Sequence, residues 1–314
     1  MSAIRPAAPA PPADAGAVSI WRLRGRRLRQ DRAAVIGAAV LALLLLVCVS
    51  APLLESLLGI DGTATDLLSR FDPPSADHWL GTDEAGRDLL LRLLRGGQVS
   101  LSIGLLGAMG CTLIGVVIGA CAGYFRGRVD TLLMRFTDFM ISLPGLPLLI
   151  ILAAVDLSKL GFPEAWIRSG TAAYWRIILI VTLLGWTGVA RLVRAATLAL
   201  AQREFVMSAR AQGASASWIL SRHILPNAIS PVIVATTLAT GRIMLTESGL
   251  SFLGVGIQPP LASWGSMLTN AQELMATAPL LAIYPGLAIF ITVIAINFLG
   301  DGLQVAFDPR SDPR

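Results

Sequence analysis

Long uncharged runs, separated by shorter charged links, dominate the hydrophobic pattern of the chain. The first run extends from Ala33 to Leu54 and the second from Gly96 to Phe125, and neither contains Asp, Glu, Lys or Arg. A helix needs about 20 consecutive apolar residues to cross the hydrocarbon core of a bilayer. Both runs are therefore predicted to be membrane-spanning helices.

Four further apolar runs lie at about 131–155, 171–196, 227–254 and 279–300. The run at 171–196 is the weakest, because Arg176, Arg191 and Arg194 leave it an uncharged centre of 14 residues. That length also fits a buried helix of a soluble protein. We interpret it as a span because six crossings fit the distribution of charge among the links and five do not. Uniform runs of this kind exclude the short alternating strands of a membrane barrel.

The arginines predict which side of the membrane each link occupies. Residues 1–32 hold seven arginines against two acids, and residues 191–222 hold five arginines against Glu204. Residues 55–98, in contrast, carry eight acids and four arginines. Since positive charge is retained on the cytoplasmic side, the sequence predicts an all-α polytopic protein. It should have six transmembrane helices with cytoplasmic N and C termini.

This pattern divides the chain into four expected parts. Residues 1–32 form a cytoplasmic Ala/Pro-rich tail and basic anchor, and 33–58 the first helix. Residues 59–98 form an extracytoplasmic link, and 99–314 hold the other five helices with a cytoplasmic loop at 199–226.

Composition supports a membrane protein and excludes a cytosolic enzyme. Apolar residues make up 54% of the 314 residues and charged residues 14%, with a mean hydropathy of +0.69, whereas soluble domains carry about 25% charged residues. The net charge of +5 does not indicate nucleic-acid binding, because the arginines lie at the ends of apolar runs and form no stripe. Membrane lipid is the expected surrounding.

Catalytic and metal-binding motifs are missing from the sequence. A phosphate-binding P-loop needs Gly-Lys followed by Ser or Thr, but Lys159 is the only lysine and lies between Ser158 and Leu160. Two histidines cannot supply a zinc-protease helix, and the three cysteines lie inside apolar runs without metal-ligand spacing. We therefore predict no catalytic residue, no metal ligand and no cofactor in this chain.

The second run carries small residues at every fourth position, namely Gly107, Cys111, Gly115, Gly119 and Gly123. One face of the helix is therefore smooth, and another backbone can approach it closely. Packing inside the chain's own bundle and a seam with another subunit explain this face equally well.

The link that follows the fourth run is too long for a simple turn between two helices. Residues 195–212 are rich in helix formers, Gly213 can end that helix, and Ser215 or Ser217 can cap a second one. The sequence thus predicts a cytoplasmic helical hairpin.

The second arm of this hairpin carries Trp218 and Ile219, followed by Leu225 and Pro226 at the start of the fifth span. A solvated loop has no need of such an apolar tip. A surface that docks a partner protein does.

Four motifs together resemble the C-type permease subunit of dipeptide, oligopeptide and nickel ABC importers, over roughly residues 20–310. They are Leu80–Asp88; Arg203–Ser215 followed by Leu225-Pro226; Leu250–Pro260 with Ser263-Trp264-Gly265; and Leu299–Leu303 ending at Asp308-Pro309-Arg310. The second is similar to the "EAA" loop of importer permeases. Met207-Ser208-Ala209 replaces Glu-Ala-Ala, so only Ala209 matches, while Gly213 and Leu225-Pro226 stand at the expected spacing.

The resemblance implies a non-enzymatic, multi-pass subunit of a bacterial inner membrane that forms half of a translocation pore. Its implied partners are a B-type permease, two cytoplasmic ATPases that bind ATP and Mg, and an extracytoplasmic solute-binding protein. Residues 204–226 would couple the ATPases to the pore, through Glu204, Ala209, Gly213, Trp218, Ile219, Leu225 and Pro226. Peptides are the expected substrates, with nickel or another small solute as the alternative.

Polar groups inside the runs are expected to be paired or functional, because an unpaired charge in a bilayer is costly. We expect Asp138 to pair with Arg135, and Glu247 either to pair with Arg242 or to line the pathway. Asn297 could form an interhelical hydrogen bond or line the pore.

Two other classes of protein are considered. A secondary transporter working alone should show an internal repeat with broken helices at matching positions. Pro144 and Pro147 interrupt the third run without a counterpart in the sixth. A membrane scaffold would not need the docking hairpin.

Overall fold

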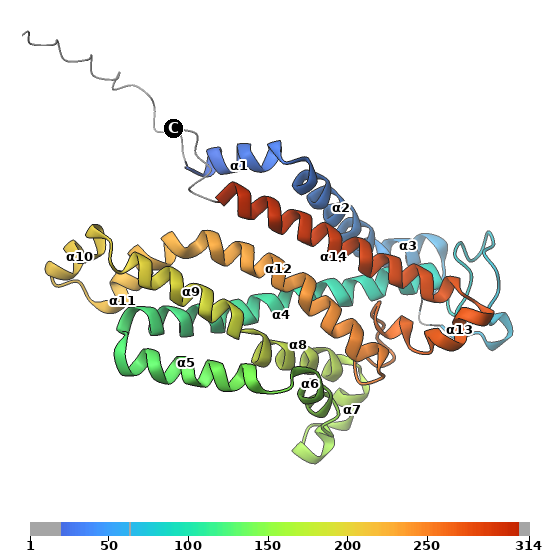
Figure 1. Cartoon of the computed structure of the whole chain (residues 1–314). Helices are drawn as coiled ribbons and strands as arrows, with labels where there is room; N and C mark the ends of the chain where they lie inside the picture. The colour runs from blue at the N-terminus through green and yellow to red at the C-terminus, as the bar shows by residue number, and fades with distance from the viewer. Residues whose placement is uncertain (1–19, 63, 308–314) are drawn as a thin grey trace, which may run out of the picture.

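A computed structural model describes residues 20–62 and 64–307, and within them the chain is helical, with an isolated bridge between Thr82 and Asp88 in place of a sheet (Figure 1). The predicted tail at 1–19 and the motif at Asp308–Arg310 lie outside the described residues. The helices are α1 Ile20–Gln30, α2 Arg32–Val49, α3 Ala51–Leu58, α4 Leu89–Phe125, α5 Gly127–Ser142, α6 Gly145–Ala153, α7 Glu164–Arg168, α8 Thr171–Gly185, α9 Thr187–Leu200, α10 Glu204–Ala211, α11 Ala216–Ile219, α12 Leu225–Phe252, α13 Ala271–Thr277 and α14 Leu280–Phe307.

The six predicted spans correspond to four long helices and two bent pairs of helices. The long helices are α2, α4, the continuous helix 216–252 that contains α12, and α14. The pairs α5–α6 and α8–α9 are bent by 82° and 43°. The first bend lies at Leu143-Pro144, where Leu143 adopts the extended conformation that a following proline favours. The third predicted run is therefore broken and not one straight helix.

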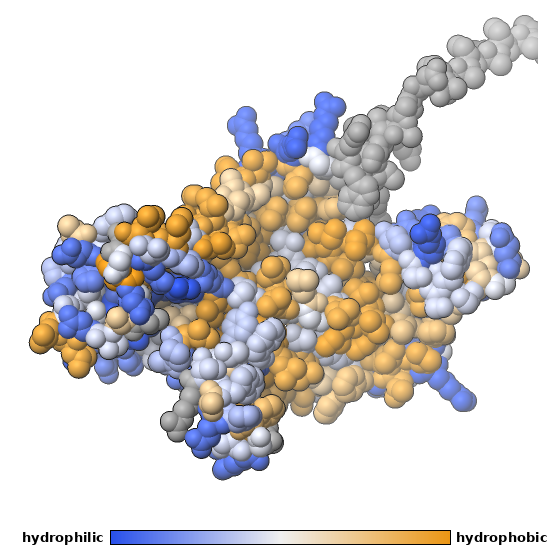
Figure 2. Space-filling model, turned by 180° about the vertical axis from the view of Figure 1, so that it is seen from behind, coloured by the Kyte–Doolittle hydropathy of each residue, from blue (hydrophilic) through white to orange (hydrophobic). Residues whose placement is uncertain are grey.

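The two ends of the bundle differ in what they carry (Figure 1). Helix α1, the hairpin of α10 and α11, and the C-terminal end of α14 lie toward one end, while α3, the link at 59–88 and α13 lie at the other. Both ends of the described chain are thus on the same side. Figure 2 shows a broad apolar surface between the two more polar ends, as expected for a band in contact with lipid or another subunit.

Helix α4 lies at the centre of the bundle and packs most extensively against α9. A Cβ placed on Gly119 would lie 2.4 Å from the carbonyl oxygen of Ala190, and one on Gly123 would lie 2.8 Å from that of Arg194. Cys111, on the same face, donates to the Val181 carbonyl of α8 at 3.3 Å. The small-residue face is therefore used for packing inside the chain.

Helix α4 begins at Leu89, inside the segment predicted to be an extracytoplasmic link. Asp88 caps it by accepting a hydrogen bond from the Leu91 amide at 2.8 Å. The charges of its first turns are neutralised, because Arg92 pairs with Asp83 at 2.5 Å and Arg95 pairs with Glu55 of α3. An uncharged run alone therefore underestimates the length of this helix.

Substitution of Gly119 by Leu should destabilise the subunit, because the backbones of α4 and α9 leave no room for a side chain. Overpacking of this kind costs about 1–3 kcal/mol or more, so the thermal unfolding midpoint of the purified subunit in detergent should fall clearly. Gly286→Leu in α14 is the matched control, since a Cβ at Gly286 meets no atom within 4 Å. Equal midpoints for the two variants would contradict the packing.

Candidate docking hairpin and intramembrane polar groups

The predicted hairpin is present, but its first arm is not one helix. Helix α9 ends at Leu200, and α10 begins at Glu204 after Arg203 has taken an extended conformation. This break turns Val206 and Ala209 back toward Tyr124 and Leu200, where they are buried. A helix continued straight through 195–212 would have left these apolar side chains without that cover.

Gly213 lies at the turn between the two arms, with φ +82°. Its amide donates to the Arg210 carbonyl at 3.0 Å, and the Ala214 amide donates to the Ala209 carbonyl at 3.1 Å. This pair of bonds is the Schellman arrangement, which needs a left-handed residue and so favours glycine.

The second arm begins at Ser215, whose hydroxyl accepts a hydrogen bond from the Trp218 amide at 3.4 Å. A π-helical turn at 220–224 then joins α11 to α12 without a break. The fifth span therefore does not start at Leu225-Pro226, as the sequence suggested. A π turn leaves the proline inside a continuous helix because its i→i+5 bonds replace part of the normal pattern.

The interior of the hairpin is apolar and closed. Val206, Ile219 and Ile224 are fully buried together, with Ala209 and Ala201 beside them. Ile219 was expected at the exposed tip, and that prediction is wrong. It supports the hairpin from inside because the short arm turns it toward Val206.

The exposed apolar surface of the hairpin consists of three side chains, which we call the hairpin patch. Phe205, Met207 and Trp218 are 42%, 53% and 48% exposed. The His223 ring lies between two of them, 5.8 Å from the Phe205 ring centroid and 4.8 Å from that of Trp218. Met207, where the resemblance implies Glu, is an exposed apolar side chain.

A hollow of about 370 Å³ lies beside Trp218 at the turn. The residues that line it are Ala209, Gln212, Gly213, Ala214, Ser215 and Trp218. Glu204 and Pro226, at the two bases of the hairpin, are exposed, and Leu225 is half-buried. A concave site beside an exposed aromatic ring is suited to receive a side chain or helix of another protein.

Two ion pairs connect the hairpin's supporting helix α9 to α5. Arg194 donates to the two carboxylate oxygens of Asp130 through Nε at 2.5 Å and Nη2 at 2.7 Å, and Arg191 donates to Asp138 at 2.6 Å. The predicted partner of Asp138 was Arg135, and that prediction is wrong. The pair is formed across helices because α5 and α9 run side by side.

Glu247 is completely buried in α12 and accepts hydrogen bonds from three serine hydroxyls. Its Oε1 accepts from Ser263 at 2.6 Å and from Ser251 at 2.7 Å, and its Oε2 accepts from Ser100 of α4 at 3.3 Å. The expected pair with Arg242 is not formed. Glu247 instead connects α12 and α4 to the segment that follows Phe252.

Two of these serines also accept hydrogen bonds from backbone amides of the segment that follows Phe252. The Trp264 amide donates to Ser100 at 3.1 Å, and the buried Trp264 indole donates to the Leu93 carbonyl at 2.8 Å. The Ile257 amide donates to Ser251 at 3.0 Å. The segment after Phe252, which has little secondary structure, is therefore held on the bundle by several hydrogen bonds. The signal for this in the sequence is the group of Ser and Trp residues that follows Glu247.

The remaining predicted site residue, Asn297, is exposed on α14. It is thus available to an environment outside the described chain and is not enclosed between two of its helices. Within residues 20–62 and 64–307, no three His, Cys, Asp or Glu side chains come close enough to hold a metal ion.

Replacement of Glu247 by Leu should destabilise the subunit, because it leaves buried serine hydroxyls without their acceptor. Such losses cost about 1–3 kcal/mol, which thermal unfolding in detergent would detect, and the 253–266 segment should become sensitive to limited proteolysis. Glu247→Gln keeps one acceptor oxygen and is the matched control. If the Leu variant proved as stable and as protease-resistant as the Gln variant, the proposed role of Glu247 in holding the 253–266 segment would be disproved.

Comparison with known proteins agrees with this architecture. Residues 115–313 match the family described as binding-protein-dependent transport system inner membrane component, and residues 19–74 match the N-terminal transmembrane domain of oligopeptide transport permease C.

Similar curated proteins cover nearly the whole chain. The dipeptide transport system permease protein DppC of Alkalihalophilus pseudofirmus is 34% identical over 97% of this chain and 95% of its own length. The oligopeptide transport system permease protein OppC of Bacillus subtilis is 36% identical, over 93% and 90%. The glutathione transport system permease protein GsiD of Pectobacterium atrosepticum is 38% identical, over 92% and 91%. The chain belongs to the family of binding-protein-dependent inner-membrane permease components of ABC importers.

Proposed function

We propose that this permease subunit forms half of the translocation pore of an importer for di- or oligopeptides. The observation that carries the proposal is the hairpin patch: three apolar side chains exposed on a hairpin whose interior is already closed. A chain of this family is a membrane component and not an enzyme, so its energy comes from another protein. The hairpin, with its exposed apolar side chains, provides a contact through which ATPase subunits could drive movement of this subunit.

The complete importer would contain a B-type permease beside this chain and two cytoplasmic ATPases that bind ATP and Mg. An extracytoplasmic solute-binding protein would deliver the substrate to the opposite end of the bundle. The hairpin suits the ATPase contact because its second arm runs without a break into α12, and its first arm follows α9, which two ion pairs hold against α5. Closure of the ATPases would thus move α9 and α12 together.

Peptides are favoured as substrates because relatives named for dipeptide and oligopeptide transport match almost the whole chain. The relative named for glutathione transport points to the same chemistry, since glutathione is itself a small peptide. The alternative substrate, which the sequence resemblance implies, is nickel or another small solute.

The orientation proposed here places the hairpin and the Arg126 turn in the cytoplasm. Single cysteines at positions 126 and 210, in a protein without the native cysteines, should react with a membrane-impermeant maleimide only after the cells are permeabilised. Cysteines at positions 72 and 273 should react in intact cells. Labelling of position 210 from outside would contradict the orientation.

Changing the hairpin should abolish coupling while assembly in the membrane survives. In Gly213→Val with Trp218→Ala, the turn is strained by roughly 1–2 kcal/mol and the patch loses its largest side chain, where truncation can cost about 2 kcal/mol or more of binding. We expect near-normal membrane levels, weakened retention of the ATPases in pull-downs, and loss of peptide uptake.

The matched control is Gly59→Val with Trp79→Ala at the other end of the bundle. Gly59 also has a positive φ, +67°, with free space around it, and Trp79 is 55% exposed. This control should keep its ATPases. Normal uptake and normal ATPase retention in the hairpin variant would remove the coupling role.

A further inference from the structure

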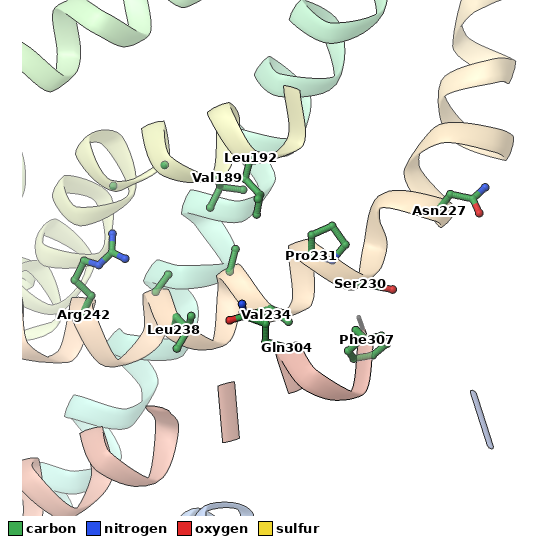
Figure 3. A pocket seen from close by; sticks show the side chains of 14 residues that line it. Val189, Leu192, Asn227, Ser230, Pro231, Val234, Leu238, Arg242, Gln304 and Phe307 are labelled. Carbon is green, nitrogen blue, oxygen red and sulfur yellow. The ribbon is translucent and has the colours of Figure 1, made fainter. Parts of the chain in front are cut away.

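A cavity of about 830 Å³ opens between α9, α12 and α14 (Figure 3). Its lining residues are Gly185, Gly188, Val189, Leu192, Asn227, Ser230, Pro231, Val234, Ala235, Leu238, Ala239, Arg242, Gln304 and Phe307. In Figure 3 the α12 side chains follow one another along the helix, from Asn227 near the hairpin end to Arg242. The cavity therefore follows α12 from its hairpin end as far as Arg242.

Arg242 is the one charged side chain among these described lining residues. It lies ten positions before the end of α12 at Phe252, which is about 15 Å along a helix. The other end of α12, at Leu225, is about 25 Å away by the same rise. Arg242 is therefore deep within the span and is exposed rather than enclosed.

No carboxylate of residues 20–62 or 64–307 lies within 4.0 Å of the Arg242 guanidinium. Two arginines of α9 are paired with acids, Arg191 with Asp138 and Arg194 with Asp130. Arg176 of α8 donates to the Val155 carbonyl at 3.3 Å. Glu247, five positions from Arg242, is fully occupied by serines. A cation at membrane depth must face water or an anion and not lipid, so Arg242 is available to an anion from outside the described chain.

We propose that Arg242 binds the carboxylate of the transported peptide inside the translocation pathway. The inference rests on the proposed function and deepens it. Every unmodified peptide carries a terminal carboxylate whatever its side chains, and a guanidinium binds a carboxylate with two parallel hydrogen bonds. The other walls are largely apolar, and the polar side chains among them are Asn227 and Ser230, toward the hairpin end, and Gln304 of α14. A single charged side chain in an otherwise largely apolar lining suits a pathway for peptides of varied sequence.

The test uses the complete importer in proteoliposomes, with its binding protein, and compares uptake of trialanine and trialanine amide. For each peptide, the rate of Arg242→Gln is divided by the wild-type rate, which cancels any preference of the binding protein. We expect a loss of about tenfold or more for trialanine, as for a lost charge-assisted hydrogen bond, and less than about twofold for the amide. Arg242→Lys should be intermediate, and the exposed Arg128→Gln should match the wild type.

Equal losses for the two peptides, or no loss for either, would overturn the proposal. So would poor recovery of the partner permease with Arg242→Gln, because the arginine would then pair with an acid of that subunit. If the wild-type importer moves neither peptide, the proposed peptide function fails as well, so the two failures are distinguishable.

A second readout does not depend on transport of the amide. A tripeptide with a photoreactive diazirine in its last residue should cross-link to the 234–242 segment of α12 in the wild type and lose this product in Arg242→Gln. A tripeptide with the diazirine in its first residue should give less of it. Cross-links that map elsewhere, or that are unchanged by the substitution, would contradict the site.

Discussion

The approach of two backbones, α4 and α9, is the constraint on which the rest of this subunit depends. Glycine at positions 119 and 123 brings main-chain atoms of α9 to distances that no side chain could occupy. In a bilayer the hydrophobic effect does not drive helices together, so dispersion contacts between such surfaces carry much of the association. Because α9 leads directly into the hairpin, this seam also fixes where the hairpin patch projects.

The charged groups of the membrane region fall into two kinds: those paired within the chain, which hold its helices together, and Arg242. The ion pairs of α9 with α5 and the serine-bound Glu247 hold helices and the 253–266 segment in place. These groups are paired inside the chain and need no ligand to neutralise them. Arg242 differs, since it is exposed in a cavity at membrane depth, and this difference is the basis for the proposal that it binds the transported peptide.

The sequence predicted those features that depend on local pattern. The apolar runs located the spans, the fourfold spacing of small residues revealed the packing face, and Gly213 marked the turn because only a left-handed residue completes it. The start of α4 was missed, because its arginines are neutralised by Asp83 and Glu55, which a hydropathy pattern cannot register.

Features that depend on tertiary contacts were not predictable in this way. Asp138 lies three residues from Arg135 but pairs with Arg191, 53 positions away, because α5 and α9 are neighbours in space. Trp218 and Ile219 are adjacent and both apolar, yet one is half-exposed and the other fully buried. Only the packing of the short arm against Val206 decides which of them can meet a partner.

The central claim is that the hairpin patch is the surface that contacts the ATPase. It is tested most directly by placing the photoreactive residue p-benzoylphenylalanine at position 218 in the assembled importer, with position 79 at the opposite end as the control. An ATPase cross-link is expected from position 218 and none from position 79. An assembled, active importer that gives no ATPase cross-link from position 218, or gives one equally from position 79, would contradict it.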